Sequence, residues 1–219
     1  MMARNVLVVA AHADDEVLGC GGTVALHTRA GDHVSCVIAC AGNGLRQPHD
    51  HSERAARTLG VADLRFLGLA DQRLDTLPLL DLGTQLQEIV REVRPQIVYG
   101  QYGADINQDH QVLFRALLVA TRPTEDFIEA VYAFDTASST EWAFPRSFVP
   151  DTWVDISATL DTKLEAMACY RTELRDYPHP RSLEALRTRA QAWGNQQCLE
   201  AAEVFMTIRR RLSGDKTPA

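Results

Sequence analysis

The stretch VVAAHADDEVLGCGG, residues 8–22, leads from an apolar run through four titratable side chains into a glycine-rich segment. Its apolar part belongs to NVLVVAA (5–11), a short run rich in β-branched residues, which is typical of a strand buried on both faces. The segment 16–31 has helical spacing and ends at Gly31, a residue suited to a helix C-terminus. We therefore expect a buried strand that passes directly into a helix.

The same alternation continues along the chain to about residue 135. Further buried strands are expected at 33–41, 64–69, 96–102 and 129–136, and helices at 51–61, 79–95 and 109–123. Alternating strands and helices predict an α/β fold, a Rossmann-like and mostly parallel sheet with helices on both faces.

The alternation stops after that point. We expect a loop with a short strand at 138–157, a helix at 158–174, and a longer helical stretch at 182–212 that breaks at Gly194. The prediction is one domain over residues 1–219. It comprises a Rossmann-like core (1–135), a C-terminal loop and helical extension (136–212) and a flexible tail (213–219).

The composition excludes several classes of protein. The chain has 219 residues and a formal net charge of −7, which disfavours nucleic acid and anionic membranes as partners. No apolar stretch approaches the roughly 20 residues of a membrane span, and the first apolar run is too short for a signal peptide. The five cysteines are scattered, so we expect reduced thiols in a cytoplasmic protein. Cys36 and Cys40 share one face of a strand as core residues.

Polar residues gather after two of the expected strands, those at 5–11 and 96–102. Ligands of open α/β sheets bind beyond the carboxyl ends of the strands, so we expect these residues to meet at one edge. They are His12, Asp14, Asp15, Asp105, Asn107, Asp109 and His110.

A dinucleotide site is excluded at the glycine-rich segment, because Val24 stands where the third glycine of G-x-G-x-x-G belongs. A metal site is the alternative. His12, Asp15 and His110 offer two imidazoles and one carboxylate, which leaves coordination positions open as in catalytic zinc sites. The same set suits iron(II). The residues alone leave this open against a structural histidine and acids that favour a helix N-terminus.

Two motifs carry a family resemblance. AHADDE (11–16) resembles the A-H-P-D-D-E signature of the PIG-L/LmbE-like zinc de-N-acetylases, and NQDH (107–110) resembles their second metal motif, which often reads H-P-D-H. The segments ERAARTLGV, LGLADQRL, SSTEW, PHPRS and AAEVF follow at family-like spacing, so the resemblance covers nearly the whole chain. Ala13 replaces the usual proline without removing a ligand.

The resemblance implies a zinc-dependent hydrolase that removes an N-acetyl group from an amino sugar or a sugar conjugate. It makes His12, Asp15 and His110 the ligands of Zn²⁺, with other divalent metals such as Fe²⁺ as alternatives. Asp14 becomes the general base and acid that acts on zinc-bound water. Asn107 replaces a common histidine and can donate a hydrogen bond to the oxyanion, although an amide cannot titrate.

Further residues receive roles with open alternatives. Asp71 resembles a ligand of substrate hydroxyls, with an Asx-type turn as the alternative, and Arg73 pairs with a substrate group or with Asp71. Asp109 is expected to orient a histidine ring. Glu16 is expected to bond backbone amides or to favour the helix dipole.

Aromatic residues and a short histidine motif complete the candidates. Trp142, Phe144 and Trp153 form either a wall for a sugar face or core packing. The motif His49–His51 is expected in a polar loop, solvated or at the substrate rim.

Two other functions compete with deacetylation. A metal-dependent hydratase of a small unsaturated carboxylic acid would need cations such as Arg46, Arg54 and Arg73. A sugar-binding protein without turnover is disfavoured because the residues that turnover needs are intact, namely His12, Asp14, Asp15 and His110. The expected partner is a small N-acetylated sugar-like molecule, and the resemblance implies a tendency toward homo-oligomers.

Overall fold

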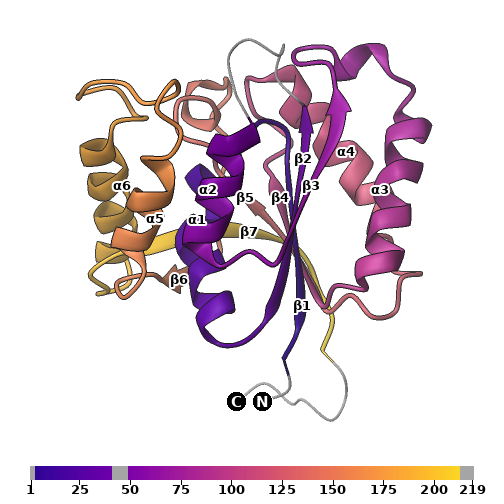
Figure 1. Ribbon diagram of the computed structural model, residues 1–219, viewed down its shortest axis with the longest axis horizontal. Helices are drawn as coiled ribbons and strands as arrows, with labels where there is room; N and C mark the ends of the chain where they lie inside the picture. The colour runs from indigo at the N-terminus through magenta and orange to yellow at the C-terminus, as the bar shows by residue number, and fades with distance from the viewer. Residues whose placement is uncertain (1–2, 41–48, 213–219) are drawn as a thin grey trace.

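A computed structural model describes residues 3–40 and 49–212, and the expected tail at 213–219 lies outside them. Within the described residues, a seven-stranded sheet lies between two layers of helices (Figure 1). The strands are β1 (Asn5–Ala10), β2 (His33–Cys40), β3 (Asp63–Leu69), β4 (Ile97–Gln101), β5 (Ala130–Phe134), β6 (Thr152–Asp155) and β7 (Ala202–Arg210).

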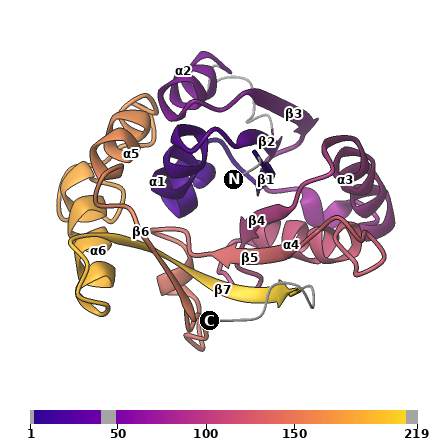
Figure 2. The ribbon, with the colours of Figure 1, turned by 90° about the horizontal axis from the view of Figure 1, so that it is seen from below.

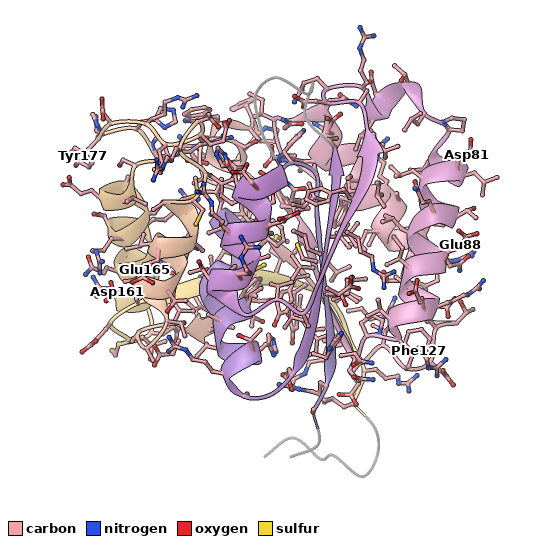
Figure 3. All side chains as sticks on the ribbon, viewed as in Figure 1. Asp81, Glu88, Phe127, Asp161, Glu165 and Tyr177 are labelled. Atoms are coloured by element: carbon pink, nitrogen blue, oxygen red, sulfur yellow. The ribbon has the colours of Figure 1, made fainter. Side chains whose placement is uncertain are left out.

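The helices cover both faces of the sheet. Figures 1 and 2 show α1, α2, α5 and α6 on one face and α3 and α4 on the other. They are α1 (Asp15–Arg29), α2 (His49–Leu59), α3 (Leu79–Val93), α4 (Gln108–Ala120), α5 (Leu160–Met167) and α6 (Leu183–Asn195), with short 3-10 helices η1 (Leu74–Thr76) and η2 (Thr140–Trp142). Figure 3 shows Asp81 and Glu88 on α3, and Asp161 and Glu165 on α5, pointing away from the sheet, as expected for the outer faces of amphipathic helices.

The strand order places two chemically rich strand ends side by side. The order is β3-β2-β1-β4-β5-β7-β6, and the first five strands run parallel. β1 pairs directly with β4, with Val9 opposite Gly100. The predicted mostly parallel sheet with helices on both faces is therefore confirmed, and the loops after β1 and β4 emerge next to each other.

The prediction of helix up to residue 212 is wrong. Helix α6 ends at Asn195, and residues 202–210 form β7, which pairs antiparallel with both β5 and β6. Residues such as Glu203 and Arg209 favour a helix locally. However, β5 and β6 supply backbone hydrogen bonds on both sides of this segment, and it therefore forms a strand. The expected helix at 158–174 is also shorter, because α5 ends at Met167.

Gly19, Gly21 and Gly22 lie inside α1, within the segment whose spacing predicts a helix. A Cβ atom at Gly19 would lie 2.0 Å from the ring of Phe134, and one at Gly22 would lie 2.9 Å from Ile156. These glycines therefore let α1 approach the sheet and the loop after β6 closely.

Helix α1 is interrupted at Cys20, whose backbone has φ −144° and ψ 20°. The carboxylate of Glu203 on β7 accepts hydrogen bonds from the amides of Gly22 and Thr23, at 2.9 and 2.7 Å. The ammonium of Lys163 lies 2.6 Å from the same carboxylate and donates to the carbonyl of Leu18. A buried ion pair thus satisfies backbone groups that the break leaves without helical partners.

Cys36 and Cys40 are both in the core, but they do not share one face of β2 as expected. Cys36 packs on one side of the sheet and Cys40 on the other, because the register shifts between Ile38 and Cys40. All five cysteines are free, and Cys20, Cys36 and Cys40 are buried. In the parts of the chain that the structure describes, no helix combines the length and apolarity needed to cross a lipid bilayer.

Candidate metal centre and active site

Three ligand atoms converge beyond the ends of β1 and β4. His12 lies in the turn after β1, Asp15 begins α1, and His110 lies in the first turn of α4. His12 Nδ1 is 3.2 Å from Asp15 Oδ2 and 3.2 Å from His110 Nε2, and His110 Nε2 is 3.4 Å from Asp15 Oδ2. The structure therefore brings together the three residues that were predicted as metal ligands.

These distances fit a zinc ion. Bonds of about 2.0 Å from zinc to nitrogen and oxygen give ligand-to-ligand edges of about 3.3 Å in a tetrahedron. All three observed separations lie close to this value. The other nitrogen of each ring lies against carboxylates, which leaves His12 Nδ1 and His110 Nε2 as acceptors beside a carboxylate oxygen. Three such atoms around one point attract protons or a metal cation, and their spacing fits a bound divalent metal.

Carboxylates lie behind both histidine rings. His12 Nε2 is 3.0 Å from Asp109 Oδ2 and 3.1 Å from Asp71 Oδ1, and His110 Nδ1 is 3.2 Å from Asp105 Oδ1. Such contacts fix the tautomer and the direction of a ligand ring. The structure thus places Asp109 against His12, whereas Asp105 lies behind the adjacent His110.

The acids also change the protonation of the rings. Burial lowers the pKa of His110, but the charges of Asp15 and Asp105 outweigh it and raise the pKa to about 9. Burial likewise lowers the pKa of His12, and contacts with Asp109 and Asp15 raise it well above the ordinary value. The pocket therefore favours a positive charge at both rings, which is the electrostatic requirement of a cation site.

Asp105 is held by a dense set of donors. Its carboxylate accepts hydrogen bonds from the hydroxyl groups of Ser139 and Thr140 and from the amide of Asn107. Asp105 was one of the polar residues expected at this edge, but it had no predicted role. Because its hydroxyl donors come from the loop after β5, only the folded structure links it to His110.

The Asp14 carboxylate has a different partner from the three ligand atoms. It is buried and adopts φ 105°, a left-handed conformation that costs energy in a non-glycine residue. Its Oδ2 atom lies 3.1 Å from Nη1 of Arg181. Adjacent acids therefore differ in direction, with Asp15 toward the histidines and Asp14 toward an arginine.

The environment of Asp14 contains opposing charges. Burial raises the pKa of Asp14, Arg181 lowers it, and Asp15 and Glu16 raise it, so that the pKa lies well above the usual range. A buried carboxylate with a raised pKa beside a candidate metal site is typical of a catalytic base.

Glu16 supports the strained turn. Its Oε2 atom accepts a hydrogen bond from the backbone amide of Asp14 at 3.1 Å, which confirms the expected bond to a backbone amide. The hydroxyl of Tyr170 donates to the other oxygen. Burial raises the pKa of Glu16 to about 7. These contacts hold Asp14 in a conformation that it would not adopt alone.

Arg181 received no role from the sequence. It lies just before α6, in the segment PHPRS, and its guanidinium contacts Asp14, Glu173 and the hydroxyl of Ser138. The segment contributed to the family resemblance, but an arginine in an irregular loop carries no periodic signal. Its position against Asp14 is visible only in the fold.

The residues expected to bind substrate lie toward solvent. The side chain of Asp71 is 33% exposed and contacts His12. Arg73 is exposed, and among the described residues no ion pair joins it to Asp71. Asn107 caps α4, because its Oδ1 atom accepts from the amide of Asp109 at 2.9 Å, which leaves its Nδ2 group as the side-chain donor.

A hollow of about 460 Å³ lies next to the buried Asp105. Its walls include Ala104, Gln111 and Phe144, whose ring is almost fully exposed. Trp142 is half-exposed and lies edge-on to His179, with ring centroids 6.1 Å apart. Phe144 is therefore the candidate aromatic residue that borders this hollow.

Two expectations for other residues need correction. Trp153 belongs to β6 at the edge of the sheet and does not line this hollow. The motif His49–His51 forms the start of α2 and is not a loop, because the helix begins two residues earlier than the sequence indicates.

Comparison with known proteins identifies the family. The model of the family PIG-L, described as GlcNAc-PI de-N-acetylase, matches residues 7–121, a segment that contains His12, Asp15 and His110. The chain belongs to the PIG-L family. Members of this family named among its relatives are deacetylases, enzymes that hydrolyse N-acetyl amides.

One relative and two solved structures illustrate the similarity. The probable N-acetyl-alpha-D-glucosaminyl L-malate deacetylase 2 of Bacillus cereus is 28% identical over 191 residues, which cover 78% of this chain and 84% of the relative. The conserved protein TT1542 from Thermus thermophilus superposes with a TM-score of 0.78 at 25% identity, covering 99% of this chain and 100% of that one.

GalB, the 4-carboxy-2-hydroxymuconate hydratase from Pseudomonas putida, has a TM-score of 0.76 at 22% identity, over 99% of this chain and 100% of GalB. At this identity the similarity shows the fold alone. The chemistry must therefore be inferred from the residues of the site.

Proposed function

We propose that this protein is a metal-dependent hydrolase that removes the acetyl group from an N-acetylated amino sugar conjugate. The observation that carries the proposal is the convergence of His12, Asp15 and His110 beside the buried carboxylate of Asp14. Membership in the PIG-L family supports it, as does the relative named for N-acetyl-alpha-D-glucosaminyl L-malate.

His12 Nδ1, His110 Nε2 and Asp15 Oδ2 would hold Zn²⁺ or another divalent metal such as Fe²⁺. When bound, such a metal lowers the pKa of a coordinated water to about 7 and polarises a carbonyl group. Asp105 and Asp109 hold the two imidazole rings in the orientation that binding requires.

Asp14 carries the proton transfers in this proposal. Its carboxylate accepts a proton from the water whose oxygen attacks the carbonyl carbon of the acetamide. The C–N bond then breaks and Asp14 returns the proton to the amine nitrogen. The other product is acetic acid, which becomes acetate when its proton passes to the amine or to solvent. Arg181 stabilises the ionised form of Asp14 between turnovers, because its guanidinium lies 3.1 Å away.

Other residues would bind and orient the substrate. The Nδ2 group of Asn107 donates a hydrogen bond to the carbonyl oxygen as negative charge develops there. Because the Asn107 amide cannot titrate, Asp14 is the only residue that acts as acid and base in this proposal. Asp71 accepts hydrogen bonds from sugar hydroxyls at the solvent-exposed rim, and Arg73 lies near it in sequence. Phe144 offers an aromatic face to the sugar beside the hollow.

The hydratase alternative is less well supported by the described arginines. A substrate with carboxylates needs unpaired cations, yet Arg181 is paired with Asp14 and Glu173, and Arg189 with Asp135. Arg54 donates to a backbone carbonyl, and Arg46 lies outside the described residues. Of these described arginines, Arg73 is the one that is exposed near the site and could bind a substrate carboxylate.

A substrate panel tests the proposal. Purified protein with added Zn²⁺ is incubated with N-acetylglucosamine conjugates that carry malate, inositol or lipid groups, and released acetate is measured. We expect acetate from at least one conjugate, with loss of activity after chelation and recovery on adding metal. No acetate from any conjugate, together with water addition to an unsaturated dicarboxylate, would overturn the proposal in favour of hydration.

A further inference from the structure

A second cluster of ligand atoms lies on the opposite side of the His12 ring. His12 Nε2, Cys40 Sγ and Asp109 Oδ2 all lie within 4.8 Å of one another. Asp71 Oδ1 lies 3.1 Å from the same ring nitrogen. Cys40 ends β2, Asp71 follows β3, and Asp109 belongs to α4, so three neighbouring elements supply the cluster. It differs from the first cluster by containing a sulfur atom.

Three of the separations match the edges of a tetrahedral metal site. With zinc bonds of about 2.0 Å to nitrogen and oxygen and about 2.3 Å to sulfur, nitrogen–oxygen edges measure about 3.3 Å and sulfur–oxygen edges about 3.5 Å. The observed values are 3.0 Å from His12 Nε2 to Asp109, 3.1 Å from His12 Nε2 to Asp71, and 3.6 Å from Cys40 Sγ to Asp109. Each differs from the expected edge by a few tenths of an ångström.

The cluster is also chemically suited to a cation. The thiol of Cys40 donates to Asp109 Oδ2, which lies against His12 Nε2 as well, so displaceable protons link these three residues. A divalent cation would release the thiol proton and the ring proton to solvent and take their place. Asp109 Oδ2 keeps its hydrogen bond from the amide of Gln72, at 2.7 Å, through its other lone pair.

Exposure defines an access path from solvent. Asp71 is 33% exposed and the side chain of His12 is 16% exposed, whereas Cys40 and Asp109 are buried. A cation arriving from solvent therefore meets Asp71 first and reaches the thiol last. The negative charges of Asp71, Asp109 and the thiolate attract a dication, and the thiolate selects soft metals.

We propose that His12 Nε2, Cys40 and Asp109, with Asp71 at the solvent-exposed side of the His12 ring, form a second metal site for a thiophilic divalent cation, Zn²⁺ or Cd²⁺, which shares His12 with the first site. The imidazole of His12 then bridges two metals, one at each ring nitrogen. Filling the second site replaces the contact through which Asp109 orients His12, and it occupies Asp71. This consequence rests on the proposed function, in which Asp71 binds sugar hydroxyls. Excess metal at the second site then competes with the substrate for Asp71.

Cadmium titration tests the second site, with two readouts that do not depend on activity. Metal-stripped protein carrying Cys198→Ser, which removes the exposed thiol, is titrated with Cd²⁺. Bound metal is counted by equilibrium dialysis, and the ultraviolet thiolate-to-metal charge-transfer band reports sulfur coordination. We expect two ions per chain and a clear band. Added Cys40→Ser should remove the band and one ion, whereas added Cys36→Ser, at another buried thiol of β2, should change neither.

Two further variants keep the inference open to refutation. His110→Ala removes a ligand of the first site alone, so the band should persist with one ion fewer. Asp71→Asn, at a partly exposed position, should weaken binding of the band-forming ion by about tenfold or more. One ion per chain, or a band that survives Cys40→Ser, would overturn the second site. Absence of acetate release with the band intact would instead refute the proposed hydrolysis and leave the second site standing.

Discussion

Replacing Arg181 by methionine removes the positive charge next to the Asp14 carboxylate and keeps a side chain of comparable reach. In the structure, Arg181 Nη1 lies 3.1 Å from Asp14 Oδ2 and 3.2 Å from Glu173 Oε2. Because this charge stabilises the ionised form of Asp14, its loss raises the pKa of Asp14 further. A base with a higher pKa stays protonated, and so inactive, over more of the acidic range.

The magnitude follows from the distance. Two unit charges 3.1 Å apart interact by about 5 kcal/mol at an effective dielectric constant of about 20. At about 1.4 kcal/mol per pH unit, this corresponds to roughly 4 pH units. Glu173 shares the guanidinium, and water replaces the lost side chain, so we expect about half of this effect, ~2 pH units. On the acid side of the profile, kcat/KM should then fall by up to about 100-fold.

The assay is the pH profile of acetate release for the wild type and three variants. In Arg181→Met the acid limb should move upward by about 2 pH units, and in Arg181→Lys by less, since a lysine keeps the charge. Arg187→Met, which removes an exposed partner of Asp161, is the matched control and should leave the profile unchanged. An acid limb that does not move in Arg181→Met, or an equal loss at every pH, would refute the role assigned to this arginine.

The remaining predictions concern the ligands, their support and the packing of α1. Asp14→Asn should retain metal but lose about 10²- to 10⁴-fold in kcat, whereas Asp15→Ala should lose metal, as measured by acetate release and elemental analysis. Near-full activity in Asp14→Asn would show that another group is the base. Asp105→Ala should weaken metal binding by about 10- to 100-fold in a chelator competition, and unchanged affinity would contradict its role behind His110. Gly19→Ala should lower the free energy of unfolding by about 1–3 kcal/mol in denaturant titrations, because the added methyl group collides with Phe134. An unchanged unfolding midpoint would mean that α1 moves aside freely.

The parallel half of the sheet could be predicted because its signals are local. Runs such as residues 6–11 and 36–40 are apolar throughout, and each is followed by a helix with its own end signal. β7 could not be predicted in this way, since residues 202–210 contain good helix formers. Their strand conformation depends on β5 and β6, which are distant in sequence.

The same distinction applies to the site. His12, Asp15 and His110 directly follow strands or begin helices, so the topology of a parallel sheet predicts that they meet. Arg181 belongs to a loop in the part of the chain where alternation has stopped. No signal in the neighbouring sequence predicts the contact of Arg181 with Asp14, because that contact depends on how α5 packs against α1 and α6 against α5.

The hydrogen bonds from α1 to Glu203 bear on how the protein is made. Synthesis proceeds from the N-terminus at about 5–20 residues per second, so His12, Asp15 and His110 leave the ribosome several seconds before Glu203. During that interval the nascent chain carries all three ligands, while the amides of Gly22 and Thr23 lack the carboxylate that accepts from them. The helix that begins at Asp15 is completed only when the last strand joins the sheet. In the proposed function, loading of metal into the fixed geometry of these three residues would follow completion of the chain.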